Sequence, residues 1–237
     1  MNDRVRQLRR QSIETRPYLS AERAQLLTAF YQSGAAARVS VPVGRALAFR
    51  YLMEHRAICI NEGELIVGER GPAPKATPTY PELCCHTLED LDVLATRERT
   101  PFAVSDDVRR VYAEEIIPFW TGRTIRERLF GSMTEGWHAA FGAGVFTEFM
   151  EQRAFGHAVL DDKIYHRGFL DFKERLAARR RALDPLGDPE AFDKDEELKA
   201  MEIAADAIIL FAERHAAAAR DLAAREKDPA RRAELER

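Results

Sequence analysis

The chain has 237 residues, of which 46% are hydrophobic and 32% charged, the proportions of a globular protein with a real core. Its 36 basic and 39 acidic residues leave a net charge of −3, which gives no electrostatic case for nucleic acid as a partner. No apolar run approaches the roughly 20 residues that span a bilayer, and the charged start MNDRVRQLRR lacks the apolar centre of a secretion signal. We therefore expect a cytoplasmic protein with no membrane partner.

Apolar residues recur at helical spacing through most of the chain, which predicts a mainly α-helical fold. Ser20 is expected to cap a helix that reaches Gly34, because a serine hydroxyl accepts a hydrogen bond from a free amide in the first turn. Thr87 and Ser105, each followed by acidic residues, predict two further helix starts. The predicted helices are 20–34, 42–55, 87–96, 105–120, 123–130, 134–142, 147–153, 170–183 and 196–236, the last with a break at 228–229.

A small β component is expected where the apolar period changes. Residues 57–60 and 64–68 are rich in β-branched side chains and flank a turn at 61–63, so they predict a short hairpin. Minor strand content is also expected around His157. In contrast, four prolines within residues 71–81 exclude regular structure from that segment.

The three cysteines, Cys59, Cys84 and Cys85, form an odd set without paired spacing, which argues against a disulfide framework. Cys84, Cys85 and His86 carry ligand types that zinc prefers. Adjacent cysteines fit badly on one tetrahedral ion, however, and no second cysteine–histidine pair occurs at the usual spacing. We therefore predict no metal site.

The segment 146–168 carries more potentially chemical side chains than any other stretch of similar length. Gly156 directly precedes His157, so the backbone can take conformations closed to other residues and aim the imidazole at a cavity. Alternatively, His157 is a core histidine that hydrogen-bonds Glu151 or Asp161, and the spacing leaves both interpretations open. The sequence has no glycine-rich phosphate loop, no GxSxG and no HExxH, so it offers no complete catalytic set.

Four stretches carry a resemblance to a known family, namely INEGELIVGERG at 60–71, TPTYPELCCHTLEDLDVL at 77–94, EEIIPFW at 114–120 and FTEFMEQRAFGHAVLDDKIYHRGFLDF at 146–172. Together they resemble the N-terminal part of the glycyl radical enzymes, which are relatives of pyruvate formate-lyase, and within that family the branch that dehydrates hydroxyproline. The resemblance extends over practically the whole chain. It implies that residues 1–237 are the N-terminal, mainly helical portion of a pyruvate formate-lyase-type domain, whose complete form is a ten-stranded α/β barrel wrapped by helices.

The resemblance implies radical chemistry in the full-length enzyme. A glycyl radical near the C-terminus, installed by an activating enzyme that uses S-adenosylmethionine and an iron–sulfur cluster, passes its spin to a cysteine in a Gly-Cys-Val-Glu segment. The resulting thiyl radical removes a hydrogen from a small-molecule substrate. Neither that cysteine nor the glycine loop occurs in this sequence, so we expect no catalytic residue and no bound cofactor in this chain. The full-length member is expected to be a homodimer.

Two residues match substrate-binding positions of the family. Phe149 would pack against the substrate ring and His157 would hydrogen-bond its polar groups, so both would orient the substrate without taking part in the chemical step. The chain departs from the family pattern at Phe155, where proline is usual, and at Ala158, where threonine is common. We expect the turn before His157 to be reshaped accordingly.

Two functional hypotheses follow. In the first, the chain is the N-terminal portion of a glycyl radical lyase that acts on hydroxyproline or a similar small molecule, or of another C–O, C–N or C–S lyase such as a diol dehydratase. In the second, it is a non-catalytic binding or assembly module derived from the family. The sequence stops at Arg237 within a helical pattern, which is expected of a truncated chain or one piece of a split enzyme. Helices separated from a barrel should then expose a large apolar surface.

Overall fold

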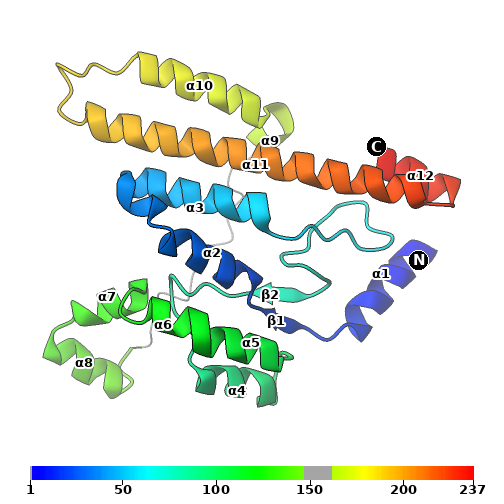
Figure 1. Cartoon of the computed structure of the whole chain (residues 1–237), viewed down its shortest axis with the longest axis horizontal. Helices are drawn as coiled ribbons and strands as arrows, with labels where there is room; N and C mark the ends of the chain where they lie inside the picture. Colours follow the sequence, from blue (N-terminus) through cyan, green and yellow to red (C-terminus); the bar gives the residue numbers. More distant parts are fainter. Residues whose placement is uncertain (1, 147–161) are drawn as a thin grey trace.

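The structure is a computed structural model, and it describes residues 2–146 and 162–237 (Figure 1). Helices dominate the described residues, which confirms the mainly α-helical fold with a small β component. The elements are α1 (Asp3–Glu14), β1 (Tyr18–Ser20), α2 (Glu22–Gln32), a 3-10 turn η1 (Ala35–Arg38), α3 (Val41–His55), β2 (Ala76–Pro78), α4 (Leu88–Thr96), α5 (Asp106–Val111), a π-turn η2 (Tyr112–Ile116), α6 (Ile117–Trp120), α7 (Ile125–Gly131), α8 (Glu135–Gly142), α9 (Lys163–His166), α10 (Phe169–Arg181), α11 (Ala191–Arg225) and α12 (Pro229–Glu236).

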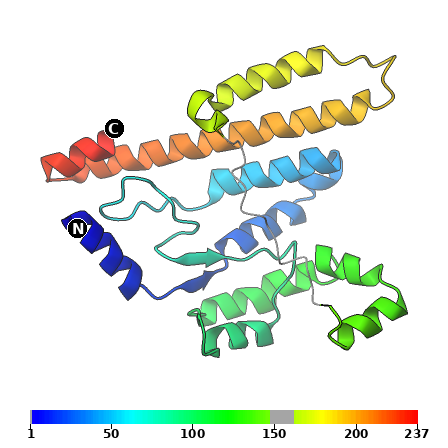
Figure 2. The same cartoon turned by 180° about the vertical axis from the view of Figure 1, so that it is seen from behind.

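Four helices lie side by side in successive layers. In Figures 1 and 2 the order across the molecule is α10, α11, α3 and α2, and the group α4–α8 lies on the far side of α2. The 35-residue helix α11 is the longest of these and extends about 52 Å at 1.5 Å per residue. Its alanine-rich stripe packs along α3, which brings the two termini of the chain to one end of the molecule.

The two strands of the described residues lie outside the predicted hairpin. β1 and β2 pair in parallel, with Tyr18 opposite Ala76 and Ser20 opposite Pro78. The hairpin predicted in residues 57–68 is wrong, because that segment contains no strand. The exclusion of regular structure from 71–81 is also wrong, because β2 lies inside it. Pro78 is tolerated there because it is the last residue of an edge strand, where a missing amide costs little.

Helix caps follow the sequence signals closely. The Thr87 side chain accepts a hydrogen bond from the Asp90 amide and the Asp90 carboxylate accepts one from the Thr87 amide, which completes a capping box at the start of α4. Ser105 caps α5 in the predicted way. Ser20 differs, because Ala21 takes the cap position of α2 and the Ser20 hydroxyl only accepts a long bond of 3.4 Å from the Glu22 amide.

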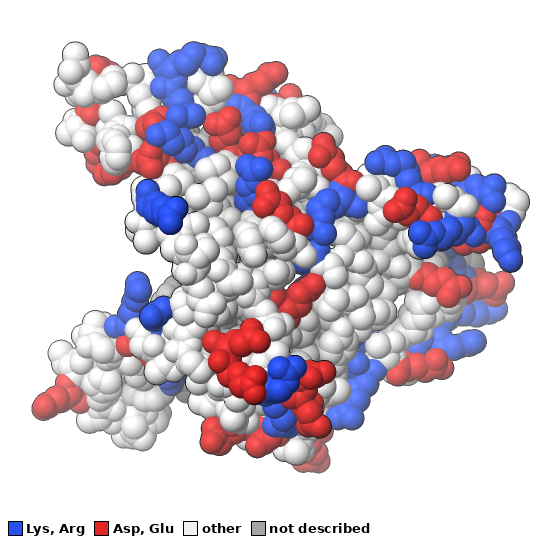
Figure 3. Space-filling view, in the orientation of Figure 1, with Lys and Arg blue, Asp and Glu red and all other residues white. Residues whose placement is uncertain are grey.

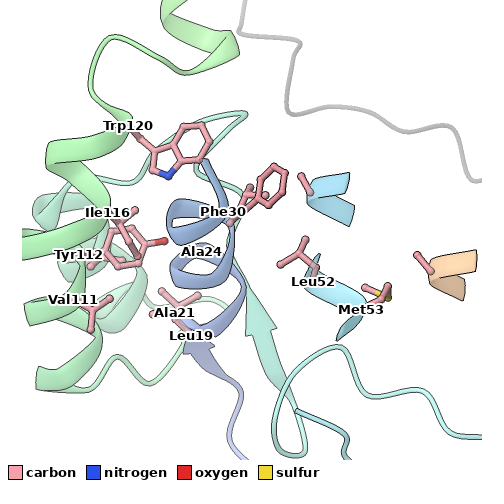
Figure 4. Packing of buried hydrophobic residues seen from close by; sticks show 14 residues of the cluster. Leu19, Ala21, Ala24, Phe30, Leu52, Met53, Val111, Tyr112, Ile116 and Trp120 are labelled. Carbon is pink, nitrogen blue, oxygen red and sulfur yellow. The ribbon is translucent and has the colours of Figure 1, made fainter. Parts of the chain in front are cut away.

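The helical run from α5 to α6 contains the π-turn η2. Pro118 has no amide with which to bond the carbonyl of Glu114, so the chain widens locally just before it. Tyr112, Ile116 and Trp120 are nevertheless all buried, and they form one wall of the main core. Figure 4 shows these side chains facing α2, with Leu52 and Met53 of α3 on the opposite side of that helix.

Polar contacts fasten the long helix to the rest of the molecule. The Arg214 guanidinium donates to the carbonyl of Met53 and, at 2.8 Å, to the carbonyl of Arg56, so it caps the C-terminal end of α3. Beyond the predicted break, Asp228 caps α12 by accepting from the Ala230 amide. Arg231 then donates to the carbonyl of Glu64 at 2.8 Å, which attaches the C-terminal helix to the segment 57–68.

The molecule exposes a large surface. Its accessible area is 16,066 Å², whereas a compact monomer of this mass exposes about 10,800 Å². Large apolar side chains are exposed on several elements, for example Trp137 on α8, Leu170 on α10 and Phe192 on α11. Figure 3 shows charged residues of both signs over α10 and α11, over α4 and α5 and at the end where α1 and α12 lie, with uncharged surface over the middle of that face. None of the described helices combines the length and apolar character needed to cross a bilayer.

Candidate functional site

Both residues predicted to bind substrate, Phe149 and His157, lie outside the described residues, which stop at Phe146 and resume at Asp162. Their predicted proximity, the strand content around His157, the helix at 147–153 and the alternative histidine partners therefore stay predictions. What the structure defines is the frame on either side of this segment. The contacts of that frame determine where the chain enters and leaves the candidate site.

An aromatic cluster fixes the entry point. The Phe146 ring lies 5.1 Å from the Trp137 ring, centroid to centroid, in an edge-to-face arrangement, and 5.8 Å from the Phe141 ring. Phe141 in turn packs edge-to-face on Phe130 at 4.9 Å. Such aromatic pairs contribute about 0.5–1.5 kcal/mol each beyond the area that they bury. Phe146, the last described residue before the candidate site, is thus held by α8, which is itself packed on Phe130 of α7.

The position of α7 is set by the loop that follows β2. The amide of Ile125 donates to the carbonyl of Glu82 at 3.0 Å, and the amide of Arg126 donates to the carbonyl of Leu83 at 3.0 Å. These bonds satisfy two of the free amides at the start of the helix. A capping box between Thr124 and Glu127 satisfies others.

Glu127 serves the same helix start with its carboxylate. It accepts from the amides of Gly122 at 2.9 Å and Thr124 at 3.1 Å and from the Thr124 hydroxyl at 2.8 Å. Partial burial alone would raise the pKa of Glu127, but these hydrogen bonds to the charged form outweigh it and lower the pKa below its ordinary value. The carboxylate is therefore ionised and structural at neutral pH.

Arg23 of α2 holds the loop itself in place. Its guanidinium forms a two-pronged ion pair with Glu82, with one N–H···O distance of 3.1 Å, and donates to the carbonyl of Thr79 at 3.0 Å. The ring of Tyr80 lies 4.0 Å from the guanidinium carbon, in cation–π contact. A single arginine therefore satisfies three groups of the loop, and it ties α2 to the start of α7.

Beneath this arginine lies a buried hydroxyl pair. The Tyr112 hydroxyl donates to the Thr79 hydroxyl at 2.6 Å, and the Tyr112 side chain is completely buried. Burial raises the pKa of Tyr112 well above its ordinary value, so the phenol stays protonated and keeps donating. Figure 4 shows Tyr112 with its hydroxyl directed toward α2.

The exit from the candidate site is fixed to a different layer. Asp162 precedes the short helix α9, and the amide of Gly168 then donates to the Asp171 carboxylate at 2.9 Å at the start of α10. Lys173 of α10 is paired with Asp206 of α11. The segment 147–161 therefore leads from the α7–α8 pair on one side to the α10–α11 pair on the other.

Cys59 and Cys85 are unsuited to thiolate chemistry at neutral pH. Burial, with smaller contributions from Glu127 and Asp90, raises the pKa of Cys85 to about 11, so its thiol stays protonated at neutral pH. Burial and nearby carboxylates also raise the pKa of Cys59, whose sulfur lies 3.6 Å from the Asn61 side-chain oxygen. Within residues 2–146 and 162–237, no group of three or more histidine, cysteine or acidic side chains could hold a metal ion.

Sequence reasoning missed Arg23 and Tyr112 as parts of the frame. Each lies on a helix among apolar neighbours, so its own stretch reads as ordinary amphipathic packing. Their partners Thr79 and Glu82 do fall within the TPTYPEL stretch that carries the family resemblance. The sequence thus carried a signal for the acceptor residues Thr79 and Glu82 and none for the donors Arg23 and Tyr112.

The comparisons with known proteins agree with this architecture. All residues of the chain, 1–237, match the Pyruvate formate lyase-like family, and the chain belongs to that family. It is 48% identical over 233 residues to the trans-4-hydroxy-L-proline dehydratase of Clostridioides difficile, an alignment that covers 98% of this chain and 29% of that protein. It is 34% identical over 232 residues to the isethionate sulfite-lyase of Nitratidesulfovibrio vulgaris, covering 94% of this chain and 28% of that protein.

The fold matches as well as the sequence. The crystal structure of hydroxyproline dehydratase from Clostridioides difficile with trans-4-hydroxy-L-proline bound superposes with a TM-score of 0.93 and 47% identity. The superposition covers 99% of this chain and 30% of that chain. The family expected from the four sequence stretches is thus confirmed, and the chain spans about 30% of the length of the relatives that it matches.

Proposed function

We propose that residues 1–237 form the N-terminal portion of a pyruvate formate-lyase-type domain in a glycyl radical dehydratase that removes water from trans-4-hydroxy-L-proline. One observation carries the choice of substrate. The identity to a trans-4-hydroxy-L-proline dehydratase is 48%, against 34% for the isethionate sulfite-lyase, over nearly the same residues.

In this proposal the chain supplies one wall of the substrate pocket. Phe149 packs against the pyrrolidine ring and His157 hydrogen-bonds a polar group of the substrate, so both act by positioning. The frame on either side supports this role, because Phe146 is held by the rings of Trp137 and Phe141 and the exit is attached to α11. When present, the glycyl radical supplies the removal of a substrate hydrogen, a step for which this chain provides no group.

The partners follow from the same proposal. An activating enzyme that uses S-adenosylmethionine and an iron–sulfur cluster installs the radical in the complete protein, which is a homodimer. The exposed apolar side chains of α8, α10 and α11 pack against the remainder of that protein. The difference between the observed 16,066 Å² and the roughly 10,800 Å² of a compact monomer of this mass supports such a covering.

The test uses the complete protein with its activating enzyme under strict anoxia. His157→Ala and Phe149→Ala are expected to raise the KM for trans-4-hydroxy-L-proline about tenfold or more, since each removes a contact to bound substrate. The glycyl doublet in electron paramagnetic resonance should stay unchanged. His55→Ala, at an exposed histidine of α3 that lies outside the frame, serves as the matched control. Unchanged KM values in both variants would refute the proposed substrate contacts and would leave His157 as a structural residue.

A substrate panel separates the proposal from its alternative. The identity to an isethionate sulfite-lyase favours C–S cleavage as the second candidate. Turnover of trans-4-hydroxy-L-proline with no release of sulfite from isethionate and no dehydration of 1,2-propanediol is the expected result. The 237-residue chain alone should give neither a glycyl doublet nor turnover, because hydrogen bonds and packing cannot remove an unactivated C–H hydrogen. Activity of the chain by itself would overturn the proposal.

A further inference from the structure

The described residues enclose a cavity at one side of α2. It has a volume of about 330 Å³ and is bounded by the start of α2, one face of α3 and the segment 70–80. That volume is at the lower end of the range of ligand pockets, about 300–1,000 Å³. None of its lining residues belongs to the frame around 147–161 except Arg23 and Tyr80, which close its edge.

The cavity carries an excess of positive charge. Arg23 is neutralised by its ion pair with Glu82, and Glu22 accepts from the Ala57 amide at 2.8 Å. The other charged lining residues are Arg56, Arg70 and Glu22, which gives a net charge of +1. Within the described part of the chain, the Arg70 guanidinium has no acceptor, and Arg56 makes one long bond of 3.4 Å to the carbonyl of Glu69.

Ser20, a buried lining residue of this cavity, has a hydroxyl without a described acceptor. Ser20 is 6% exposed, and its oxygen accepts only the 3.4 Å bond from the Glu22 amide. Its proton has no acceptor among residues 2–146 and 162–237. A buried donor of this kind costs about 1–3 kcal/mol when it is left unsatisfied, so a ligand that brings an acceptor to it gains that free energy on binding.

The remaining wall is apolar. Phe49 is half-buried, and Leu52 and Met53 are buried side chains of α3 that line the same space. A ligand that satisfies both halves of the cavity has one negative charge at one end and a short hydrocarbon chain at the other. A monoanion fits this cavity better than a dianion, because the lining residues carry a net charge of only +1.

From these features we propose that this cavity binds a small aliphatic monocarboxylate, with the carboxylate between Arg56, Arg70 and the Ser20 hydroxyl and the hydrocarbon chain against the α3 wall. A guanidinium and a carboxylate form charge-assisted bonds in a matching planar geometry. The site is independent of the proposed dehydratase activity, because it shares no substrate-binding residue with it.

Isothermal titration calorimetry of the 237-residue chain with pentanoate, in a low-chloride buffer, tests this proposal without any turnover. We expect a dissociation constant on the order of 1 mM. Acetate lacks three methylenes, each worth about a fourfold change in affinity, and should bind at least tenfold more weakly. Pentanamide has the same shape without the charge and should also bind at least about tenfold more weakly.

The variants identify the binding groups. Arg70→Gln is expected to weaken pentanoate about tenfold and Ser20→Ala about threefold or more. Arg10→Gln, at an exposed arginine of α1, is the matched control and should leave the affinity unchanged. Circular dichroism confirms that each variant keeps its helical fold, and Arg70 is exposed, so its replacement should not unfold the chain. Absence of binding at about tenfold higher pentanoate, equal binding of pentanamide, or equal loss in Arg10→Gln would each overturn the proposal.

Discussion

Tyr112 offers the most direct test of how the frame is held together. Its hydroxyl lies 2.6 Å from the Thr79 hydroxyl, and both residues are buried, at 0% and 4% exposure. Tyr112→Phe removes the donor, keeps the ring in place and leaves the Thr79 oxygen without that partner. We expect the free energy of unfolding to fall by about 1–2 kcal/mol, which lies between the net value of a hydrogen bond and the cost of an unsatisfied buried group.

The same position gives a larger effect when the ring is lost. Tyr112→Ala removes a fully buried aromatic side chain from the core cluster and should cost about 3–5 kcal/mol. For a chain of this length each kcal/mol lowers the Tm by about 2–4 °C. Urea unfolding monitored by circular dichroism measures both variants, and an unchanged m value shows that the unfolded states are comparable.

A double-mutant cycle isolates the hydroxyl pair. Thr79→Val combined with Tyr112→Phe should cost less than the sum of the two single changes, with a coupling energy of about 1 kcal/mol. Tyr165→Phe, at a tyrosine that is 85% exposed, is the control and should stay within about 0.5 kcal/mol of the parent. If Tyr112→Phe costs no more than Tyr165→Phe, or the coupling energy is zero, the buried pair does not stabilise the frame.

Three further predictions concern the rest of the fold. Arg214→Met should lower the free energy of unfolding by about 2 kcal/mol in urea titrations, because two carbonyls at the end of α3 lose a charged donor, and Arg214→Lys should lie between it and the parent. Hydrogen bonds from Arg180 and Lys199 lower the pKa of Asp195 from 3.8 to about 2. The ionised carboxylate therefore stabilises the fold above about pH 4, and this stabilisation is lost as the pH falls toward 2. In Asp195→Asn the urea midpoint should depend less on pH within that window and be unchanged in its pH dependence outside it. Gly71→Ala places a Cβ 2.5 Å from the Ala76 Cβ and should cost about 1–3 kcal/mol, which Ala76→Gly in the same chain should restore.

Local signals predicted the described helices except α1 and α9, because the information lies within a few residues. Thr87 with Asp90, and Ser105 with the acidic residues after it, fix the starts of α4 and α5 through their own hydrogen bonds. The first turn of α11 was missed, since it begins at Ala191 and the predicted start was 196. Its first residues are mostly charged, so the apolar stripe that carries the periodicity begins only later.

The strands required information from distant parts of the chain. The stretch Leu65, Ile66 and Val67 has strand-forming side chains, but strand structure also needs a hydrogen-bonding neighbour, which the described residues do not provide there. Ile66 is 88% exposed instead. β1 and β2 are three residues each, which is too short for an alternating pattern to indicate a strand. They also pair across a long sequence separation, which no local signal records.

The frame around the candidate site combines local and distant determinants in the same way. The resemblance named Phe149 and His157 as substrate-binding residues, but nothing in that stretch indicates what fixes its two ends. The ion pair between Arg23 and Glu82 joins residues 59 positions apart, and neither has a sequence pattern that selects the other. Such pairings become visible only once the helices are placed.

The described residues on both sides of 147–161 are connected to the same helix, α2, through chains of contacts. On the entry side, Arg23 of α2 fixes the Glu82 loop, that loop fixes the start of α7, and the α7–α8 aromatic rings hold Phe146. On the exit side, α10 is paired to α11, α11 packs along α3, and α3 packs on α2. The separation of the two ends is therefore set by rigid helices and does not depend on the segment itself. Since a misplacement of about 1 Å can cost a hundredfold in rate, two anchors on packed helices limit that loss for any group that the chain holds between them.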